Sequence, residues 1–206
     1  MSATNGIPVS ASQIATLREQ TGAGIMECKK ALEEARGDMS KAKEILKDRG
    51  IAVAAKLGGR SATDGLIGSY IHAVGKLGVL VELSCETDFV ARNEEFQELL
   101  RELCFQIAAM GPRWISRDQV PQDVLDAKRK EFEKEAIEEK KPAAIAPKIA
   151  EGKLDKYLSD FCLLDQVYVR ESSGKVKIKD LFTKAIGSLK ENIVLRRFVR
   201  FQVGGE

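Results

Sequence analysis

Residues 79–100 read VLVELSCETDFVARNEEFQELL and contain an abrupt change of pattern. The first seven form the most apolar run of the chain and alternate as a strand does, whereas from Phe96 onward apolar residues recur at helical spacing. A strand therefore ends and a helix begins around Thr87. At such a corner neither burial pattern fixes the side chains, so Asp88 and Phe89 can point outward from two rigid supports.

Two interpretations of this corner fit the sequence. In the first, Phe89 contacts a partner protein, because an exposed aromatic ring beside an acid suits an interface. In the second, Phe89 lies seven residues before Phe96 and continues the buried face of the helix, while Asp88 or Asn93 caps that helix. The segment alone leaves both open, and burial is the commoner fate of an apolar residue.

The flanking sequence extends the corner into an α+β core. Residues 65–73 alternate with period two and turn through Gly75 into the run at 79–85, which predicts an antiparallel hairpin. A third alternating run at 193–203 closes the chain. We expect about three antiparallel strands with helices packed on one face of the sheet.

Helices are predicted between the second and third strands. Residues 122–141 are highly charged and predict a solvated helix. Another helix can open at Pro142, although Pro147 and Gly152 interrupt its apolar stripe. The best amphipathic pattern of this half covers residues 178–189.

The N-terminal part predicts a small bundle of three helices. Ser10 begins the first helix with a capping box, the second runs over residues 25–36, and the third runs over 40–49 and stops at Gly50. Residues 51–57 can add a further turn, and the glycines that follow indicate a hinge or linker. We therefore divide the chain into a bundle (1–52), a linker (53–64) and a core domain (65–206).

Met26 is out of place in this bundle. It lies on the opposite side of the second helix from Cys28, among charged residues, while Ile25 lies at the margin of the apolar stripe. A single exposed methionine needs no functional explanation. Alternatively, Met26 is an adaptable apolar contact for a partner, flanked by a glycine-rich turn and Arg18.

Composition excludes several classes of protein. The 33 Lys and Arg nearly balance the 31 Asp and Glu, so no overall field attracts nucleic acid or an anionic membrane. The four cysteines are scattered and His72 is the single histidine, which argues against a zinc site. The N-terminus does not resemble a secretory signal, and no run is long enough to span a membrane. We expect a cytoplasmic protein with reduced, buried thiols.

The motifs of an enzyme are also missing. Residues 21–24, TGAG, lack the lysine and hydroxyl of a phosphate-binding loop, and no nucleophile–base spacing is recognisable. An interaction protein is therefore favoured. The alternative is a nucleic-acid-binding module that uses the N-terminal helices and the C-terminal arginines Arg196, Arg197 and Arg200. Acidic residues on the second helix, including Glu27, argue against that alternative.

Two long motifs resemble a known family. The stretch LREQTGAGIMECKKAL at 17–32 resembles the N-terminal signature of bacterial translation elongation factor Ts, and ETDFVARN at 86–93 resembles its second signature. The likeness extends over nearly the whole chain, in the short form with one core subdomain. It implies a guanine-nucleotide exchange factor for elongation factor Tu that needs no cofactor or metal and does not bind nucleic acid directly.

The resemblance also implies roles for particular residues. In this family the segment matching Thr87 to Val90 inserts its Asp-Phe pair, here Asp88 and Phe89, between helices of the partner and disturbs the partner's magnesium site. A bundle similar to the ubiquitin-associated fold holds another part of the partner. The remaining matching contact positions are Arg18, Ile25, Met26 and His72. These matches favour exposure of Phe89 and Met26, and they make a homodimer through the sheet plausible.

Overall fold

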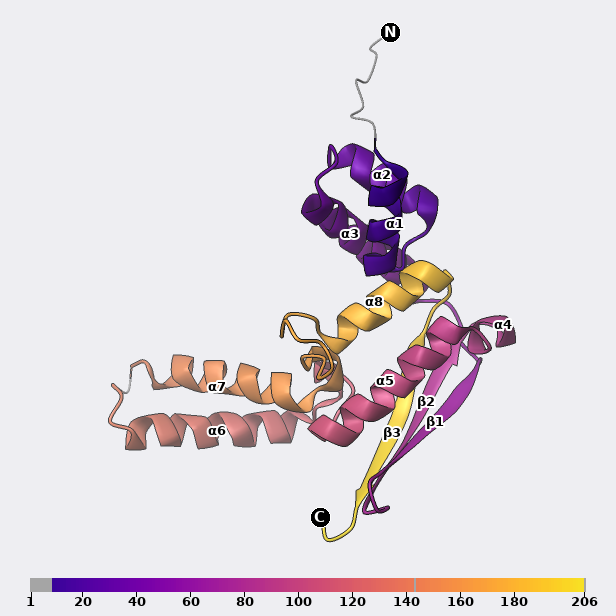
Figure 1. The fold of residues 1–206 in the computed structure, drawn as a ribbon. Helices are drawn as coiled ribbons and strands as arrows, with labels where there is room; N and C mark the ends of the chain where they lie inside the picture. Colours follow the sequence, from indigo (N-terminus) through magenta and orange to yellow (C-terminus); the bar gives the residue numbers. More distant parts are fainter. Residues whose placement is uncertain (1–8, 143, 206) are drawn as a thin grey trace. The chain divides into compact units, whose positions relative to one another are not determined.

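The structure is a computed structural model that describes residues 9–142 and 144–205 (Figure 1). The first eight residues, part of the N-terminus predicted to lack a secretory signal, lie outside the described residues. The predicted α+β class is confirmed: helices pack on an antiparallel sheet of three strands in the order β1-β2-β3.

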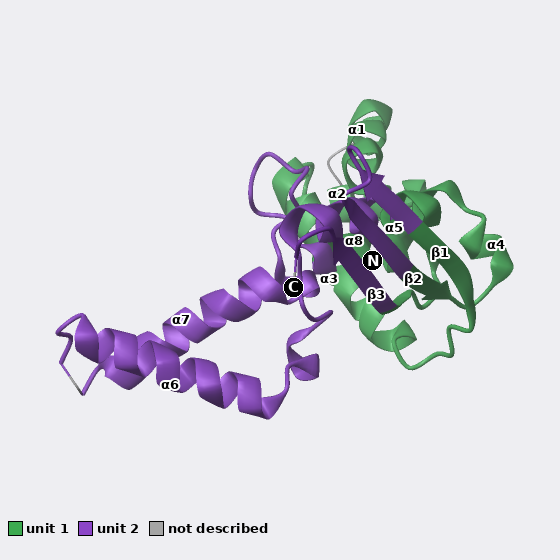
Figure 2. Ribbon diagram, turned by 90° about the horizontal axis from the view of Figure 1, so that it is seen from below, with its two compact units in different colours: residues 1–68, 82–100, 180–196 green, residues 69–81, 101–179, 197–206 purple. Residues whose placement is uncertain are grey.

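The chain forms two compact units, which are coloured separately in Figure 2. The strands and helix α5 contribute residues to both units. Among the described residues, unit 1 takes those up to 68, 82–100 and 180–196, and unit 2 takes 69–81, 101–179 and those from 197 onward. The division at residues 52 and 64 stays a prediction.

The predicted N-terminal bundle is present in unit 1. It consists of α1 (Ala11–Thr21), α2 (Ile25–Glu34) and α3 (Met39–Leu57). The capping box at Ser10 is confirmed, since its hydroxyl accepts from the backbone N–H of Gln13 and the Gln13 side chain accepts from the backbone N–H of Ser10. The bundle has its own small core, made of Leu17, Cys28, Ala31, Leu32, Ala35 and Ala42.

The predicted end of the third helix at Gly50 is wrong. Helix α3 continues through Gly50 to Leu57 and ends at Gly58. A Cβ added at Gly50 would lie 3.2 Å from the Cγ2 atom of Thr183, and one added at Gly187 would lie 3.6 Å from the Cα atom of Gly50. The glycine therefore permits a close approach of α3 to α8 (Ile178–Leu189) and does not end the helix.

The segment after α3 is anchored by hydrogen bonds within unit 1. The side-chain amide of Asn192 donates to the carbonyl oxygen of Arg60 at 2.7 Å, and the guanidinium of Arg196 donates to that of Ala62 at 2.6 Å. Ala62 itself is buried. These contacts tie the predicted linker to the residues on either side of β3's start.

The sheet consists of β1 (Asp64–His72), β2 (Leu77–Cys85) and β3 (Val194–Gln202). Strand β2 is central, and one of its faces is buried through Val79, Val81, Leu83 and Cys85. Gly65 has a φ of +144°, and a Cβ there would lie 2.2 Å from the carbonyl oxygen of Leu83. Only glycine permits this approach of β1 to β2.

Two helices continue from β2. The single turn α4 (Asp88–Ala91) is followed at once by α5 (Glu94–Met110). The apolar stripe predicted for α5 is confirmed as buried, and it consists of Phe96, Leu99, Leu100, Leu103 and Ile107. The predicted stripe of α8 is likewise buried at Ile178, Phe182, Ala185 and Ile186.

In unit 2, helices α6 (Gln122–Glu138) and α7 (Ala146–Phe161) run side by side as an arm (Figure 1). They are flanked by the 3-10 turns η1 (Arg117–Gln119) and η2 (Leu163–Asp165). A buried cluster of Val120, Leu154, Leu158 and Cys162 lies beside them, and Val124, Leu125 and Phe132 of α6 pack against it.

The predicted interruption of α7 at Pro147 is wrong. Pro147 lies in the first turn of the helix, where the missing N–H has no helical partner to lose. The helix begins later than predicted, after Ile145, which is exposed and not part of the stripe. Gly152 lies inside the helix with nothing near its missing Cβ, so it does not interrupt it either.

Candidate functional site

The corner after β2 is built as a capped single turn. Thr87 is the N-cap of α4, with extended backbone and a hydroxyl that accepts from the N–H of Val90 at 3.4 Å. Ala91 anchors the turn because it is buried. The next helix begins at Glu94, and the side chain of Asn93 just before it accepts from the N–H of Glu95. Asn93 thus caps α5, as the second interpretation of this corner expected.

Phe89 is nevertheless exposed. It lies in the first turn of α4 with 80% of its surface accessible, so the interpretation that it continues the buried face of α5 is wrong. Its neighbour Asp88 forms an ion pair with Arg92 at 2.9 Å. Phe89 therefore leaves most of its apolar ring in contact with solvent, on a turn whose backbone is capped.

The bundle presents a pair of exposed apolar residues. Met26 and Ile25, in the first turn of α2, are 61% and 54% exposed, which confirms the predicted exposure of Met26. Arg18 is exposed in the last turn of α1, and its carbonyl oxygen accepts from the N–H of Gly22, whose φ is +72°. The tight turn between the helices places the three side chains around one bend.

This bend packs on α8 within unit 1. A Cβ at Gly22 would lie 2.8 Å from the Cε atom of Lys184, the mobile end of a long side chain, and the φ of +72° is what favours glycine there. The hydroxyl of Ser188 contacts the carbonyl oxygen of Gly22 at 3.4 Å and donates to the carboxylate of Glu95, in the first turn of α5, at 2.7 Å. Ser188 therefore connects the glycine turn of the bundle with the helix that follows Phe89.

His72 belongs to unit 2. It is exposed at the end of β1, and its Nδ1 lies 2.8 Å from the hydroxyl of Tyr70, which packs edge-on against Phe105 at 4.6 Å between ring centroids. Beside them is an open cavity of about 530 Å³, lined by Tyr70, His72, Phe105, Ala108, Ala109, Val169 and Arg170. The guanidinium of Arg170 lies 5.2 Å from the centre of the Phe105 ring.

The described residues offer little for metal or nucleophilic chemistry. Residues 9–142 and 144–205 contain no group of three or more His, Cys, Asp or Glu side chains that could hold a metal ion. The four cysteines are free and buried, and burial raises the pKa of Cys85, Cys104 and Cys162 to about 11. Within the same residues, no helix has both the length and the apolar character needed to cross a bilayer.

Sequence reasoning missed Glu191, which lies between α8 and β3. Its carboxylate accepts hydrogen bonds from the N–H of Glu86, the N–H of Thr87 and the hydroxyl of Thr87. Glu191 is 104 residues from Thr87 in the chain, so no local pattern could indicate this contact.

Comparison with known proteins agrees with the two sequence motifs. A family model described as elongation factor TS matches residues 11–204. The chain belongs to the elongation factor Ts family. The resemblance stated from residues 17–32 and 86–93 is thereby confirmed, and the chain is identified as a translation elongation factor.

Relatives within the elongation factor Ts family cover almost the whole chain. Elongation factor Ts from Anaeromyxobacter sp. (strain K) is 54% identical over 197 residues, which make up 95% of this chain and 89% of that protein. The protein of the same name from Thermoanaerobacter pseudethanolicus is 50% identical over 196 residues, 95% of each chain. That from Thermodesulfovibrio yellowstonii is 51% identical over 196 residues, 95% of this chain and 96% of that protein.

Proposed function

We propose that this protein is a guanine-nucleotide exchange factor that binds elongation factor Tu and promotes GDP release during translation elongation in the cytoplasm. The observation that carries the proposal is Phe89, an aromatic residue 80% exposed on a capped turn, within one of the two motifs that resemble the family. Thr87 to Val90 form the segment inserted into the partner. The role is binding and not bond chemistry.

The mechanism that we propose weakens the partner's hold on its nucleotide. Magnesium and the phosphate-binding loop supply much of a GTPase's affinity for GDP, so a wedge that shifts the helices carrying the metal ligands lowers that affinity. Phe89 supplies the apolar anchor. Asp88 positions the turn through its ion pair with Arg92, since one carboxylate without further oxygen ligands is a poor magnesium site.

Thermodynamic linkage constrains this exchange. The factor must bind the nucleotide-free partner more tightly than the GDP-bound partner, and GDP must weaken binding of the factor by the same ratio. No bond in GDP changes during the process. The factor therefore speeds the approach to the equilibrium between GDP-bound and GDP-free partner, which the partner alone reaches slowly.

Two further contacts support the wedge in our proposal. The exposed pair Ile25 and Met26, with Arg18 beside it, binds another part of the same GTPase through the bundle. His72 provides a separate contact in unit 2, where the neighbouring cavity can accept an apolar side chain of the partner.

The nucleic-acid alternative receives less support. The guanidinium groups of Arg196 and Arg200 are directed to the carbonyl oxygens of Ala62 and Ala108, so they are engaged within the protein. On α2, Glu27 remains a negative charge that phosphate binding would have to overcome, although it pairs with Lys190.

A homodimer through the sheet is also proposed. On the face of the unit 2 sheet opposite the buried side chains, four apolar residues are 37% to 68% exposed: Ile71, Leu80, Val199 and Phe201. The charged variant Leu80→Lys is expected to convert a dimer to a monomer in sedimentation velocity. A wild-type chain that sediments as a monomer at micromolar concentration would refute the dimer.

The test of the exchange proposal is release of fluorescent GDP from elongation factor Tu at fixed magnesium concentration. The protein should accelerate release in proportion to its concentration until the partner is saturated. Because linkage requires it, excess unlabelled GDP should also displace the factor from its complex. No acceleration of release with a cognate partner would refute the proposal.

A further inference from the structure

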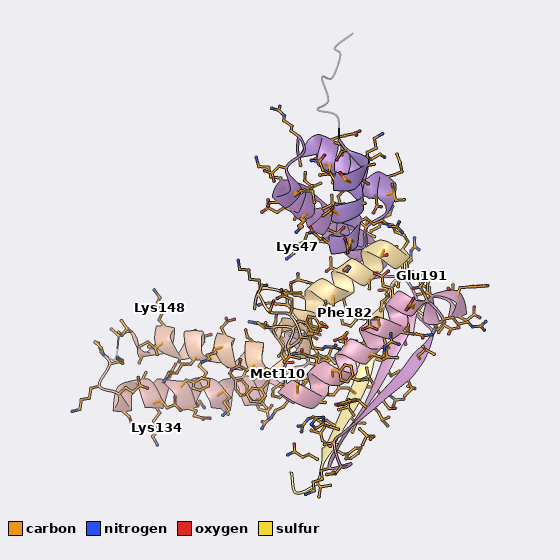
Figure 3. All side chains as sticks on the ribbon, in the orientation of Figure 1. Lys47, Met110, Lys134, Lys148, Phe182 and Glu191 are labelled. Carbon is orange, nitrogen blue, oxygen red and sulfur yellow. The ribbon has the colours of Figure 1, made fainter. Side chains whose placement is uncertain are left out.

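We infer that Glu191 is a positioning residue that holds the Asp88–Phe89 turn in the conformation that enters the partner. The inference rests on the proposed exchange function and assigns a role to a residue outside both sequence motifs. The carboxylate of Glu191, which is labelled in Figure 3, accepts hydrogen bonds from Glu86 and Thr87. In our proposal it does not bind the partner and acts on Phe89 through Thr87.

The Glu191 carboxylate uses both oxygens on the base of the turn. Oε2 accepts from the N–H groups of Glu86 and Thr87 at 3.0 Å each, and Oε1 accepts from the hydroxyl of Thr87 at 2.6 Å. These two N–H groups follow the last residue of β2, where pairing with the neighbouring strand has ended. Charge-assisted hydrogen bonds thus replace the sheet at the point where the chain leaves it.

The Thr87 hydroxyl transmits this restraint to α4. Because its hydrogen is donated to Glu191, its oxygen is oriented to accept from the N–H of Val90, the contact that caps the helix. A helix of four residues does not persist by itself. Phe89, between Thr87 and Val90, gains little from packing of its own ring, so its direction depends on the backbone of this turn.

The restraint is reciprocal. The carboxylate of Glu86 accepts from the N–H of Asn192 at 2.8 Å, and Asn192 in turn donates to the carbonyl oxygen of Arg60. Residues 86–87 and 191–192 therefore bind each other in both directions. The same cluster reaches the chain that leaves the bundle, so within unit 1 it connects both proposed partner contacts.

A general loss of stability is the alternative to a positioning role, and a double-mutant cycle separates the two. Phe89→Ala, Glu191→Ala and the double variant are compared in GDP release from elongation factor Tu. If Glu191 acts through Phe89, Glu191→Ala lowers the maximum release rate at least about fivefold, and adding it to Phe89→Ala changes little. Losses that multiply in the double variant would overturn the inference.

Two further variants sharpen the test. Glu191→Gln keeps an oxygen for the two backbone N–H groups but loses the charge and the acceptor for the Thr87 hydroxyl, so its rate should lie between those of Glu191→Ala and the wild type. Asp165→Ala is the matched control, because Asp165 is a carboxylate 15% exposed with ion pairs to Arg117 and Lys179. It should lower the melting temperature and leave the maximum rate unchanged. A rate loss in Asp165→Ala equal to that in Glu191→Ala would refute positioning.

Amide hydrogen exchange tests, without the partner, whether Glu191 orders the α4 turn. Glu191→Ala should increase exchange of the Ala91 and Arg92 amides, which are bonded to the carbonyl oxygens of Thr87 and Asp88, whereas Asp165→Ala should not. If the wild-type protein fails to accelerate GDP release, the proposed function fails, and exchange at α4 still reports whether Glu191 orders the turn. Unchanged protection of Ala91 in Glu191→Ala would overturn the inference in either case.

Discussion

Truncation of Phe89 to alanine should separate partner binding from folding. In the free protein the ring is 80% exposed, so its removal leaves no cavity. The free energy of unfolding should change by less than about 0.5 kcal/mol, the range for surface substitutions. A buried phenylalanine would instead cost about 3–5 kcal/mol.

The loss in binding can be worked from the same exposure. Full burial of a phenylalanine side chain is worth about 1.5–3 kcal/mol. Phe89 has 80% of its surface left to bury, so the partner contact is worth about 1.2–2.4 kcal/mol. At about 1.4 kcal/mol per tenfold change, Phe89→Ala should weaken binding to the nucleotide-free partner about 7- to 50-fold.

Two measurements check this prediction: a titration of GDP release against factor concentration, and a thermal unfolding curve. Ile137→Ala is the matched control, because Ile137 is an apolar residue 58% exposed on α6 and belongs to none of the proposed contacts. Its titration and its melting temperature should equal those of the wild type. A melting temperature lowered by many degrees in Phe89→Ala, or an unchanged titration, would refute the reasoning.

Two other predictions concern the bundle and the thiols. Met26→Asp should weaken partner affinity at least about tenfold without unfolding the bundle, because Met26 is 61% exposed. Isothermal titration calorimetry checks this, with Lys43→Asp on α3 as the control variant. Equal affinities of the two variants would remove Met26 from the interface. Burial raises the thiol pKa to about 11 at three cysteines, so the folded chain holds these protons longer than the unfolded chain, and the free energy of unfolding should fall between about pH 9 and 11. Chemical denaturation at pH 9 and pH 11 checks the change in the free energy of unfolding. Labelling of Cys85, Cys104 and Cys162 by a thiol reagent at pH 8 should be slow in the native protein.

Much of the fold follows from local patterns because those patterns report local physics. The capping box at Ser10 and the buried stripe of α5 both depend on residues within a few positions of each other. The period-two runs likewise predicted the hairpin and the last strand. The exposed position of Phe89 was not decided by periodicity, and only the match of residues 86–93 to the family favoured it.

Glycine and proline were the points at which local reasoning failed. Glycine is common at helix ends, which is why Gly50 was predicted to end the third helix. Helix α3 nevertheless continues through Gly50, where the absence of a side chain lets it pack closely on Thr183 of α8. Proline usually interrupts a helix, but Pro147 lies in the first turn of α7, where proline is tolerated. In both cases a contact or a register that the sequence does not display decided the outcome.

By itself, the sequence determined the α+β class, most helices and strands, the two motifs and the family. The tertiary structure decided what supports the wedge. Glu191 reaches Thr87 across 104 residues, and Ser188 joins the Gly22 turn to Glu95, because the end of α8 and the start of α5 meet in unit 1. Contacts between distant segments depend on packing of the whole unit, so no periodicity or spacing in the chain encodes them visibly.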